Sequence, residues 1–468
     1  WVRNVEVYFR VESDLRTLSQ ALMLLGEISH SVNNGERRSI VLKRLLDDGF
    51  LLRWWRFARP KLQNGDGASL SVILRAHATL QVLPSGEDFD LWLKGAGNME
   101  TFDASALTNV IWSLARLRVS GEKLERALKM WVPRFEKEAH MVQPQGAVDV
   151  LWALGRMKVP TTEKMRAGLQ QRFRETTTSF TPVQLAEYLD GCAQCPGVMR
   201  SSSWEAWQLQ FRKALREITN ADLGLCLVSA GRLGRQFNDA TMIGLKFELG
   251  KDGRRPSAKD LARIMWGVAT MRRTLEGRAL RRWRAHWTHT INYADCDDLA
   301  DGFWGMMVIG AQPIESMLNI WTSAWMSRAH TLTGAQTSKI IWALARVELE
   351  IKPQVLSMIK SRLMYCITRD EFSLPVLVEC EWALYKLGSP PKENVCRFVR
   401  SAIERKTAEL REKEQASAEV HTSSSGFYDD EGNDQALTFE DEVDIEDDRS
   451  AETHESEQKE FMDEGDDE

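Results

Sequence analysis

The chain has 468 residues, of which 43% are hydrophobic and 27% are charged, a balance typical of globular proteins. No apolar run approaches the about 20 residues of a membrane span, so no membrane partner is expected. Seven scattered cysteines indicate a reducing compartment without a disulfide framework. The net charge of -6 combines two parts of opposite sign. Residues 421–468 hold 20 Asp or Glu and 2 Lys or Arg, a net charge of -18, and the rest of the chain therefore carries +12.

In chain order, the sequence predicts three regions. Residues 1–64 are expected to form an N-terminal helical cap or degenerate repeats, since "LSQALMLLGEI" from Leu18 loosely matches the motif described next. Residues 65–412 are expected to form a repeat domain. Residues 413–468 are expected to be a disordered acidic tail, because so few large apolar residues cannot offset the entropy of ordering.

One motif recurs along the repeat domain. It is clearest at "NVIWSLARLRV" (Asn109), "DVLWALGRMKV" (Asp149) and "KIIWALARVEL" (Lys339). Further copies begin at Arg263, Asp301 and Glu379, and looser ones at Val72, Glu187 and Leu225. The residues in the Trp position, spaced 37 to 40 apart, are Arg75, Trp112, Trp152, Asp190, Val228, Trp266, Trp304, Trp342 and Trp382. So regular a period indicates a repeat protein.

Each period has room for two helices. Apolar residues recur one, two and five positions before the Trp position and two and five positions after it. In a helix, which turns by about 100° per residue, these positions form one apolar stripe. A second amphipathic stretch follows, as in "GEKLERALKMWVPRFEKE" from Gly121 and "PQVLSMIKSRLMYCI" from Pro353. The sequence therefore predicts an all-α fold, an α-solenoid of about nine to ten helix–turn–helix repeats of about 38 residues, plus the disordered acidic tail.

The position after the Trp position is always small, and the third position after it is usually small. The first set is Ala76, Ser113, Ala153, Gly191, Ser229, Gly267, Gly305, Ala343 and Ala383. Small side chains let helices approach closely. We therefore expect this face of the motif helix to be the packing seam between repeats.

Two further columns lie beside the Trp position. The fourth residue after it is basic in five of nine copies, Arg116, Arg156, Arg232, Arg346 and Lys386, and we call these the basic column. The third residue before it varies, and we call the polar members Asn109, Asp149, Glu187, Arg263, Asp301, Lys339 and Glu379 the variable column. In stacked repeats the basic column would form a row of groups that bind RNA phosphates, and the variable column would form a row of groups that read bases.

The motif resembles the octotricopeptide and heptatricopeptide repeats, and the leucine-rich helical region of FAST-kinase-like proteins, over about residues 65–405. The resemblance implies single-stranded RNA as the partner, with a role in RNA processing, stability or translation in the mitochondrion or plastid. It also implies other organellar RNA-processing or ribosomal proteins as possible partners, and no DNA. Many relatives end in a RAP domain, which is not seen here. Because the chain begins with Trp1, a targeting segment would not be visible.

Each functional interpretation has a simpler alternative. The basic column could only complement helix dipoles, and acidic members of the variable column would repel phosphate. The Trp residues could stack on bases, although burial against the next repeat is favoured by their small neighbours. An armadillo-like protein scaffold, or a structural subunit of an organellar ribosome, is the alternative function, and the salt dependence of RNA binding would distinguish it.

Catalytic and metal sites are not predicted. "CAQC", from Cys192 to Cys195, is a lone CxxC pair without a second pair, so its cysteines are expected to be core residues. "HWTH", from His286 to His289, has metal-like spacing but no third ligand. No phosphate-binding glycine loop and no nucleophile–base pair is found. The chain is expected to be neither an enzyme nor a cofactor-binding protein.

Overall fold

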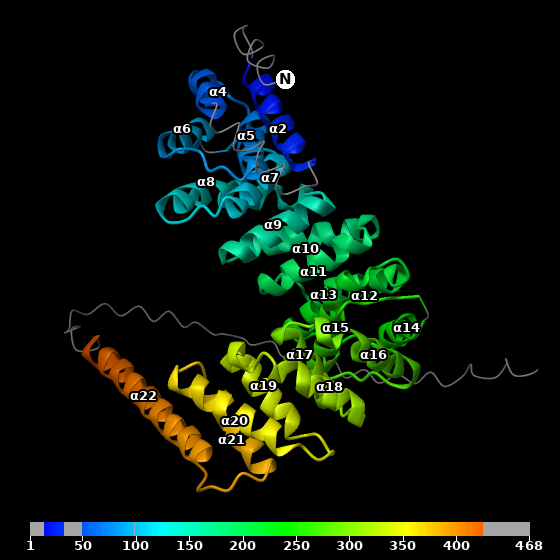
Figure 1. Cartoon of the computed structure of the whole chain (residues 1–468). Coiled ribbons are helices and arrows are strands. Elements are labelled where there is room, and N and C mark those ends of the chain that lie inside the picture. Colours follow the sequence, from blue (N-terminus) through cyan, green and yellow to red (C-terminus); the bar gives the residue numbers. More distant parts are fainter. Residues whose placement is uncertain (1–13, 32–48, 98, 252, 425–468) are drawn as a thin grey trace, which may run out of the picture. The chain divides into compact units, whose positions relative to one another are not determined.

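A computed structural model describes residues 14–31, 49–97, 99–251 and 253–424. In these ranges the backbone forms α-helices, short 3₁₀ helices and loops, without a strand. The chain divides into two units, residues 1–407 and 408–468. In the first unit the helices follow one another as antiparallel pairs, each stacked on the next (Figure 1). This confirms the predicted all-α solenoid.

The motif helices form one row, which we call the first row. Each packs mainly on the preceding and following helix of that row. Their bounds are α2 (Leu15–Ser31), α5 (Gly67–Leu80), α7 (Ala104–Arg116), α9 (Pro144–Met157), α11 (Pro182–Gln194), α13 (Asn220–Arg232), α15 (Ala258–Thr270), α17 (Cys296–Val308), α19 (Gly334–Leu344) and α21 (Leu374–Lys386).

The helices that follow them form the second row, and several are followed by one 3₁₀ turn. Their bounds are α4 (Phe50–Ala58), α6 (Gly86–Ala96), α8 (Glu122–Glu138), α10 (Glu163–Thr176), α12 (Ser201–Ala214), α14 (Asp239–Gly250), α16 (Gly277–Thr290), α18 (Glu315–Met326) and α20 (Pro353–Thr368). The 3₁₀ helices are η1 (Arg59–Asn64), η2 (Ala139–Met141), η3 (Thr177–Ser179), η4 (Ile291–Tyr293) and η5 (Ala329–Thr331).

The last helix, α22 (Asn394–Ser424), begins in the first unit and ends in the second. It passes residue 412, where the sequence predicted the tail to begin, because "ELREKEQASA" consists of strong helix formers with a single serine. The acidic segment 425–468 lies outside the described residues. Its disorder therefore stays a prediction.

First-row helices begin at an equivalent residue in each repeat. The N-cap lies nine residues before the Trp position, and in most repeats its side chain accepts a hydrogen bond from the backbone N–H three residues later. The sequence analysis did not identify this column, which consists of Asp66, Asp103, Gln143, Thr181, Thr219, Ser257, Asp295, Thr333 and Ser373.

The small residue after the Trp position packs against the preceding repeat. A Cβ atom added at Gly191 would lie 2.6 Å from the Cβ of Leu151, and one at Gly305 would lie 2.8 Å from the carbonyl oxygen of Met265. Leu151 and Met265 both directly precede the Trp position of their own repeat. The non-glycine members of the column are completely buried. The predicted seam between repeats is confirmed.

A second recurring contact joins the two rows. A buried indole N–H from a second-row helix donates to the backbone carbonyl five residues before the Trp position of the same repeat, at 2.8–3.0 Å. The donor and acceptor pairs are Trp92 and Leu70, Trp131 and Leu107, Trp207 and Leu185, Trp283 and Leu261, and Trp321 and Leu299. This bond ties the second-row helix to the first-row helix in these five repeats.

The same contacts identify α2 as the motif helix of a tenth repeat. Trp54 of α4 donates to the carbonyl of Leu18 at 3.0 Å, which puts Met23 in the Trp position. Asp14, nine residues earlier, accepts from the N–H of Thr17. The segment "LSQALMLLGEI" thus makes the contacts of a motif helix, and its spacing to the next repeat is longer than the period.

The indole bond can be measured by one substitution and its matched control. Trp283→Phe should lower the free energy of unfolding by about 1 to 2 kcal/mol, since it removes a buried hydrogen bond as well as apolar area. Trp287→Phe on the same helix removes an equally buried indole whose N–H has no hydrogen-bond partner among the described residues. Urea titrations should show the larger loss for Trp283→Phe, and equal losses would contradict the role assigned to the bond.

Candidate nucleic-acid interface

The Trp residues of the motif lie on the first row and keep part of their surface exposed. Trp112, Trp152, Trp304 and Trp342 are half-buried, and Trp382 is 36% exposed. The predicted burial against the next repeat is therefore only half right. The small residue that follows each Trp occupies the seam, and the Trp side chain, about 100° away around the helix, lies at the edge of that seam.

Neighbouring repeats bring these rings together. The centroids of Trp112 and Trp152 are 6.4 Å apart, those of Trp304 and Trp342 are 6.0 Å apart, and those of Trp342 and Trp382 are 6.4 Å apart. The planes are tilted by 37° to 43° in these pairs, so the rings do not stack face to face. We call these five residues the aromatic ladder.

Guanidinium groups lie over the ladder. The Cζ atom of Arg75 is 3.6 Å from the ring centroid of Trp112, and Arg156 is 5.4 Å from that of Trp152. Arg346 lies between two rings, 4.1 Å from Trp342 and 5.4 Å from Trp382. Cations at these distances are attracted by the ring face. The ladder therefore combines aromatic faces with positive charge.

The basic column lies at the exposed C-terminal ends of first-row helices. Arg116, Arg156, Arg346 and Lys386 form no ion pair with another described residue, whereas Arg232 lies 3.8 Å from Asp190. Two members of the column, Arg156 and Arg346, are the same residues that lie over the aromatic ladder. The sequence analysis did not predict this proximity, although the spacing of four residues between each of these arginines and the Trp of its own repeat places the two side chains on one face.

The variable column is half-buried except for the exposed Glu379, and it is partly engaged in contacts between repeats. Asp301 forms an ion pair with Lys339 of the next repeat, and Asp149 lies 3.5 Å from Arg75. Burial raises the pKa of Asp301, and the hydrogen bond from Lys339 opposes that rise. These polar groups already hold neighbouring repeats together. Of the predicted base-reading residues, Asn109, Glu187, Arg263 and Glu379 make no such pair within the described residues.

The ladder is interrupted from the fifth to the seventh repeat, beginning with an acidic stretch around Asp190. The Trp position is occupied by Asp190 and by the buried Val228 in the fifth and sixth repeats, and Trp266 of the seventh is half-buried without a ring contact to another described Trp. Burial raises the pKa of Glu187, and the nearby carboxylates of Asp149, Asp222 and Asp190 raise it further. The ladder is thus split into an N-terminal part with Trp112 and Trp152 and a C-terminal part ending at Trp382.

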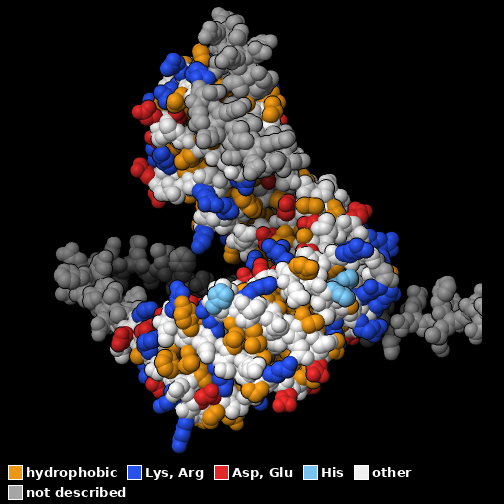
Figure 2. Space-filling model, in the orientation of Figure 1, with side chains coloured by type: hydrophobic (Ala, Val, Ile, Leu, Met, Phe, Trp, Pro, Cys, Tyr) orange, Lys and Arg blue, Asp and Glu red, His pale blue; other side chains and the backbone are white. Residues whose placement is uncertain are grey.

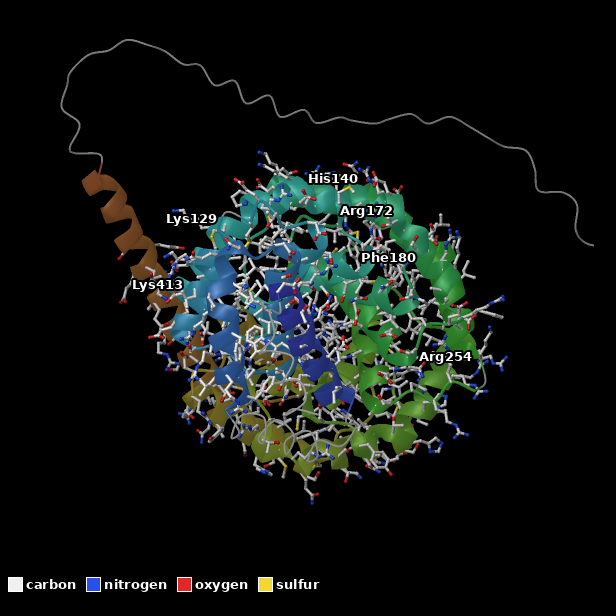
Figure 3. All side chains as sticks on the ribbon, turned by 90° about the horizontal axis from the view of Figure 1, so that it is seen from above. Lys129, His140, Arg172, Phe180, Arg254 and Lys413 are labelled. Carbon is white, nitrogen blue, oxygen red and sulfur yellow. The ribbon has the colours of Figure 1, made fainter. Side chains whose placement is uncertain are left out.

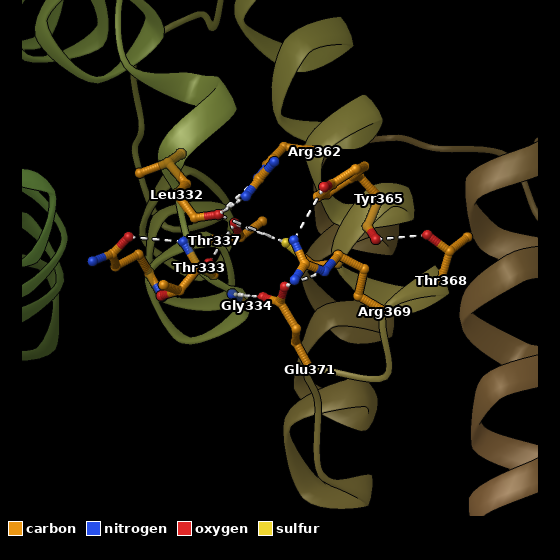
Figure 4. Close-up of polar contacts among 11 residues, drawn as sticks. Leu332, Thr333, Gly334, Thr337, Arg362, Tyr365, Thr368, Arg369 and Glu371 are labelled. Atoms are coloured by element: carbon orange, nitrogen blue, oxygen red, sulfur yellow. Dashed lines mark hydrogen bonds and ion pairs between the residues drawn. The ribbon is translucent and has the colours of Figure 1, made fainter.

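Several other arginines are used structurally and were missed by the sequence analysis. Each donates to the carbonyl ten residues before a Trp position, next to the N-cap of a first-row helix. The pairs are Arg134 and Phe102, Arg172 and Val142, Arg254 and Ile218, Arg328 and Ala294, and Arg362 and Leu332. Arg172 and Arg254 are labelled in Figure 3, and the Arg362 bond is drawn in Figure 4. These groups satisfy backbone carbonyls that no helix bonds.

The cysteines and histidines considered as metal ligands do not form a site. Cys192 and Cys195 are buried and unpaired, as expected, and burial raises the pKa of Cys195 to about 11. His286 is half-buried and His289 is exposed on α16. Among the described residues, no group of three or more His, Cys, Asp or Glu side chains could hold a metal ion. The same residues contain no helix that is long and apolar enough to cross a membrane.

No family model matches this chain, and no curated protein shows a significant match. The resemblance to octotricopeptide-type repeats therefore stays a prediction from the motif.

Proposed function

We propose that the first row of this solenoid binds single-stranded RNA. The observation that carries the proposal is the partly exposed aromatic ladder with Arg75, Arg156 and Arg346 over its rings. Proteins that bind single strands combine aromatic faces, on which bases stack, with cations that follow the phosphates. Both elements recur here with the repeat, as a polymeric ligand requires.

In this proposal the two columns have different roles. Bases stack on the Trp rings, and the exposed basic column contacts phosphates. Base selectivity is limited to the free members of the variable column, such as Asn109 and Arg263, since Asp301 and Lys339 are paired with each other. RNA binding at two short ladders, separated by the acidic stretch around Asp190, should therefore involve two groups of nucleotides.

The cellular role is proposed from the resemblance of the motif. It is RNA processing, stability or translation in the mitochondrion or plastid, together with other RNA-processing or ribosomal proteins. One observation favours a second function, a protein scaffold: the acidic stretch of Glu187, Asp190 and Asp222 would repel phosphate and attract a basic protein segment.

RNA binding can be tested with the full chain and an oligouridine of about 20 nucleotides in a salt series. The triple variant Arg116→Glu, Arg156→Glu, Arg346→Glu should bind at least tenfold more weakly. It should also lower the slope of log K against log salt by about 2, because three phosphate contacts are lost. Trp112→Ala with Trp152→Ala should weaken binding at every salt concentration by about 1 to 3 kcal/mol per lost stack.

A matched control has the same change of charge on the second row. Lys129, Lys137 and Lys164 are exposed on α8 and α10 and form no ion pair with other described residues, and their triple change to Glu should leave most of the RNA affinity intact. If both triple variants lose affinity equally, binding is not localised to the ladder. If the wild-type chain does not bind RNA at low salt, the scaffold function is the one to pursue.

A further inference from the structure

The positive charge of the chain is concentrated in one stretch. Residues 201–290 contain 17 Lys and Arg and 8 Asp and Glu, a net charge of +9, against +12 for all of residues 1–420. Figure 2 shows Lys and Arg side chains gathered at the edge of the molecule where Figure 1 places α14 and α16. This edge belongs to the second row, so it is separate from the aromatic ladder.

The second-row helices α12, α14 and α16 are in register there. Trp207, Leu245 and Trp283 are buried at equivalent positions 38 residues apart, and both indoles donate to first-row carbonyls. The same spacing relates Leu209 of α12 to Phe247 of α14, on the side opposite the core. Equivalent outward residues therefore form continuous rows across the three helices.

Large apolar side chains occupy the centre of this outward face. Ile243 and Phe247, one helical turn apart on α14, are 68% and 62% exposed, and Leu209 beside them on α12 is 45% exposed. The equivalent residues on α18, Asn319 and Ser323, are polar. Exposed apolar residues that cluster in this way usually mark an interaction surface.

Cations surround this apolar centre. The Nζ atom of Lys251 lies 4.6 Å from the ring centroid of Phe247, and the Arg278 side chain packs beside Gly250. Lys213, Arg255 and Arg281 are exposed and form no ion pair with other described residues. Two nearby acids are paired with cations, Glu276 with Lys246 and the buried Glu248 with Lys251. Glu205, one turn before Leu209 on α12, is exposed and forms no ion pair with another described residue. Unpaired cations therefore still outnumber unpaired acids around the three apolar side chains.

We propose that this outward face of α12, α14 and α16 docks on an anionic lipid bilayer. Ile243, Phe247 and Leu209 would enter the interface between headgroups and acyl chains, while the surrounding cations would contact anionic headgroups. A phosphodiester chain would use the cations but would leave Ile243 and Leu209 without a partner. The earlier expectation of no membrane partner considered spanning segments, and this contact requires none.

The test is co-sedimentation of the full chain with vesicles of phosphatidylcholine alone and of phosphatidylcholine with about one third phosphatidylglycerol. Binding is expected only to the anionic vesicles and should fall with salt. Ile243→Ser with Phe247→Ser should reduce the partition coefficient at least tenfold, and so should Lys213→Glu with Arg281→Glu. These residues are exposed, so circular dichroism should show an unchanged fold for both variants.

Two controls separate this site from the proposed RNA site. Arg116→Glu with Arg156→Glu, an equal change of charge on the first row, should leave vesicle binding unchanged. Val183→Ser with Ile314→Ser, two exposed apolar residues elsewhere, should do the same. The proposal is overturned if the wild-type chain does not bind anionic vesicles, or if the control variants lose as much binding as the face variants. It is also overturned if the face variants lose RNA binding and keep vesicle binding, because the face would then contact nucleic acid.

Discussion

Gly267→Val is expected to lower the free energy of unfolding by about 3 kcal/mol, although glycine is a poor helix former. A Cβ atom at this position would lie 2.5 Å from the carbonyl carbon of Leu227 in the preceding repeat. Real Cβ atoms do not approach backbone atoms so closely, so α13 and α15 would have to separate. Overpacking of this kind typically costs about 1 to 3 kcal/mol, and here it outweighs the gain in helix propensity.

The control for this substitution is another glycine of a neighbouring helix. At Gly250, the last residue of α14, the three atoms nearest to an added Cβ all belong to the Arg278 side chain, at 3.5 Å or more. Gly250→Ala should therefore leave stability unchanged or raise it slightly. Urea titrations of both variants measure the comparison. A Gly267→Val chain as stable as the wild type would show that the seam is not closely packed.

Acidification from pH 6.5 to pH 4 is expected to destabilise the chain through His77 by about 3 kcal/mol. His77 lies on α5, 1% exposed and next to Trp54 and Trp55, and one ring nitrogen, Nδ1, lies 2.8 Å from the carbonyl oxygen of Val82. Burial lowers the pKa of His77 from 6.5 to about 4, and the Val82 contact opposes this only partly. Between pH 6.5 and pH 4 the unfolded chain binds a proton that the folded chain excludes. The free energy of unfolding therefore decreases as the pH is lowered through this range.

His77→Leu isolates this contribution. Other repeats have leucine at the same position, two residues after the Trp position, as at Leu114, Leu154 and Leu344. The difference in unfolding free energy between the variant and the wild type should shift in favour of the variant by about 3 kcal/mol from pH 7 to pH 4. A difference that does not change with pH would show that the folded and unfolded chains bind the His77 proton equally.

The features that repeat with the period could be predicted from the sequence. The spacing of the Trp position gave the number of repeats, and the small residues after it located the seam, because close helix packing tolerates little else there. The N-cap column could also have been found, since Asp, Thr or Ser stands nine residues before most Trp positions. These properties are local to one repeat and its nearest neighbour, so a single sequence is sufficient to show them.

The environment of each site residue depended on contacts that differ from repeat to repeat. Arg346 lies over Trp342 and Trp382, whereas Arg232, at the same motif position, lies beside Asp190. Arg346 lies over Trp342, four residues before it in the same repeat, as the spacing alone allows. Its second ring, Trp382, and the Asp190 partner of Arg232 come from neighbouring repeats. The sequence therefore located the basic column and its nearest ring, but not the contacts between repeats.

Tertiary structure alone decided which face is apolar and exposed. The sequence analysis did not single out Ile243 or Phe247, and it favoured burial of Trp112 and Trp152 against the next repeat. In the structure the first two are exposed and the Trp side chains are only half-buried. The reason is that each helix of a solenoid is covered by two neighbours in its own row and by the other row. The exposed face of a helix is the one that no neighbouring helix covers. The periodicity within one helix does not determine which face that is.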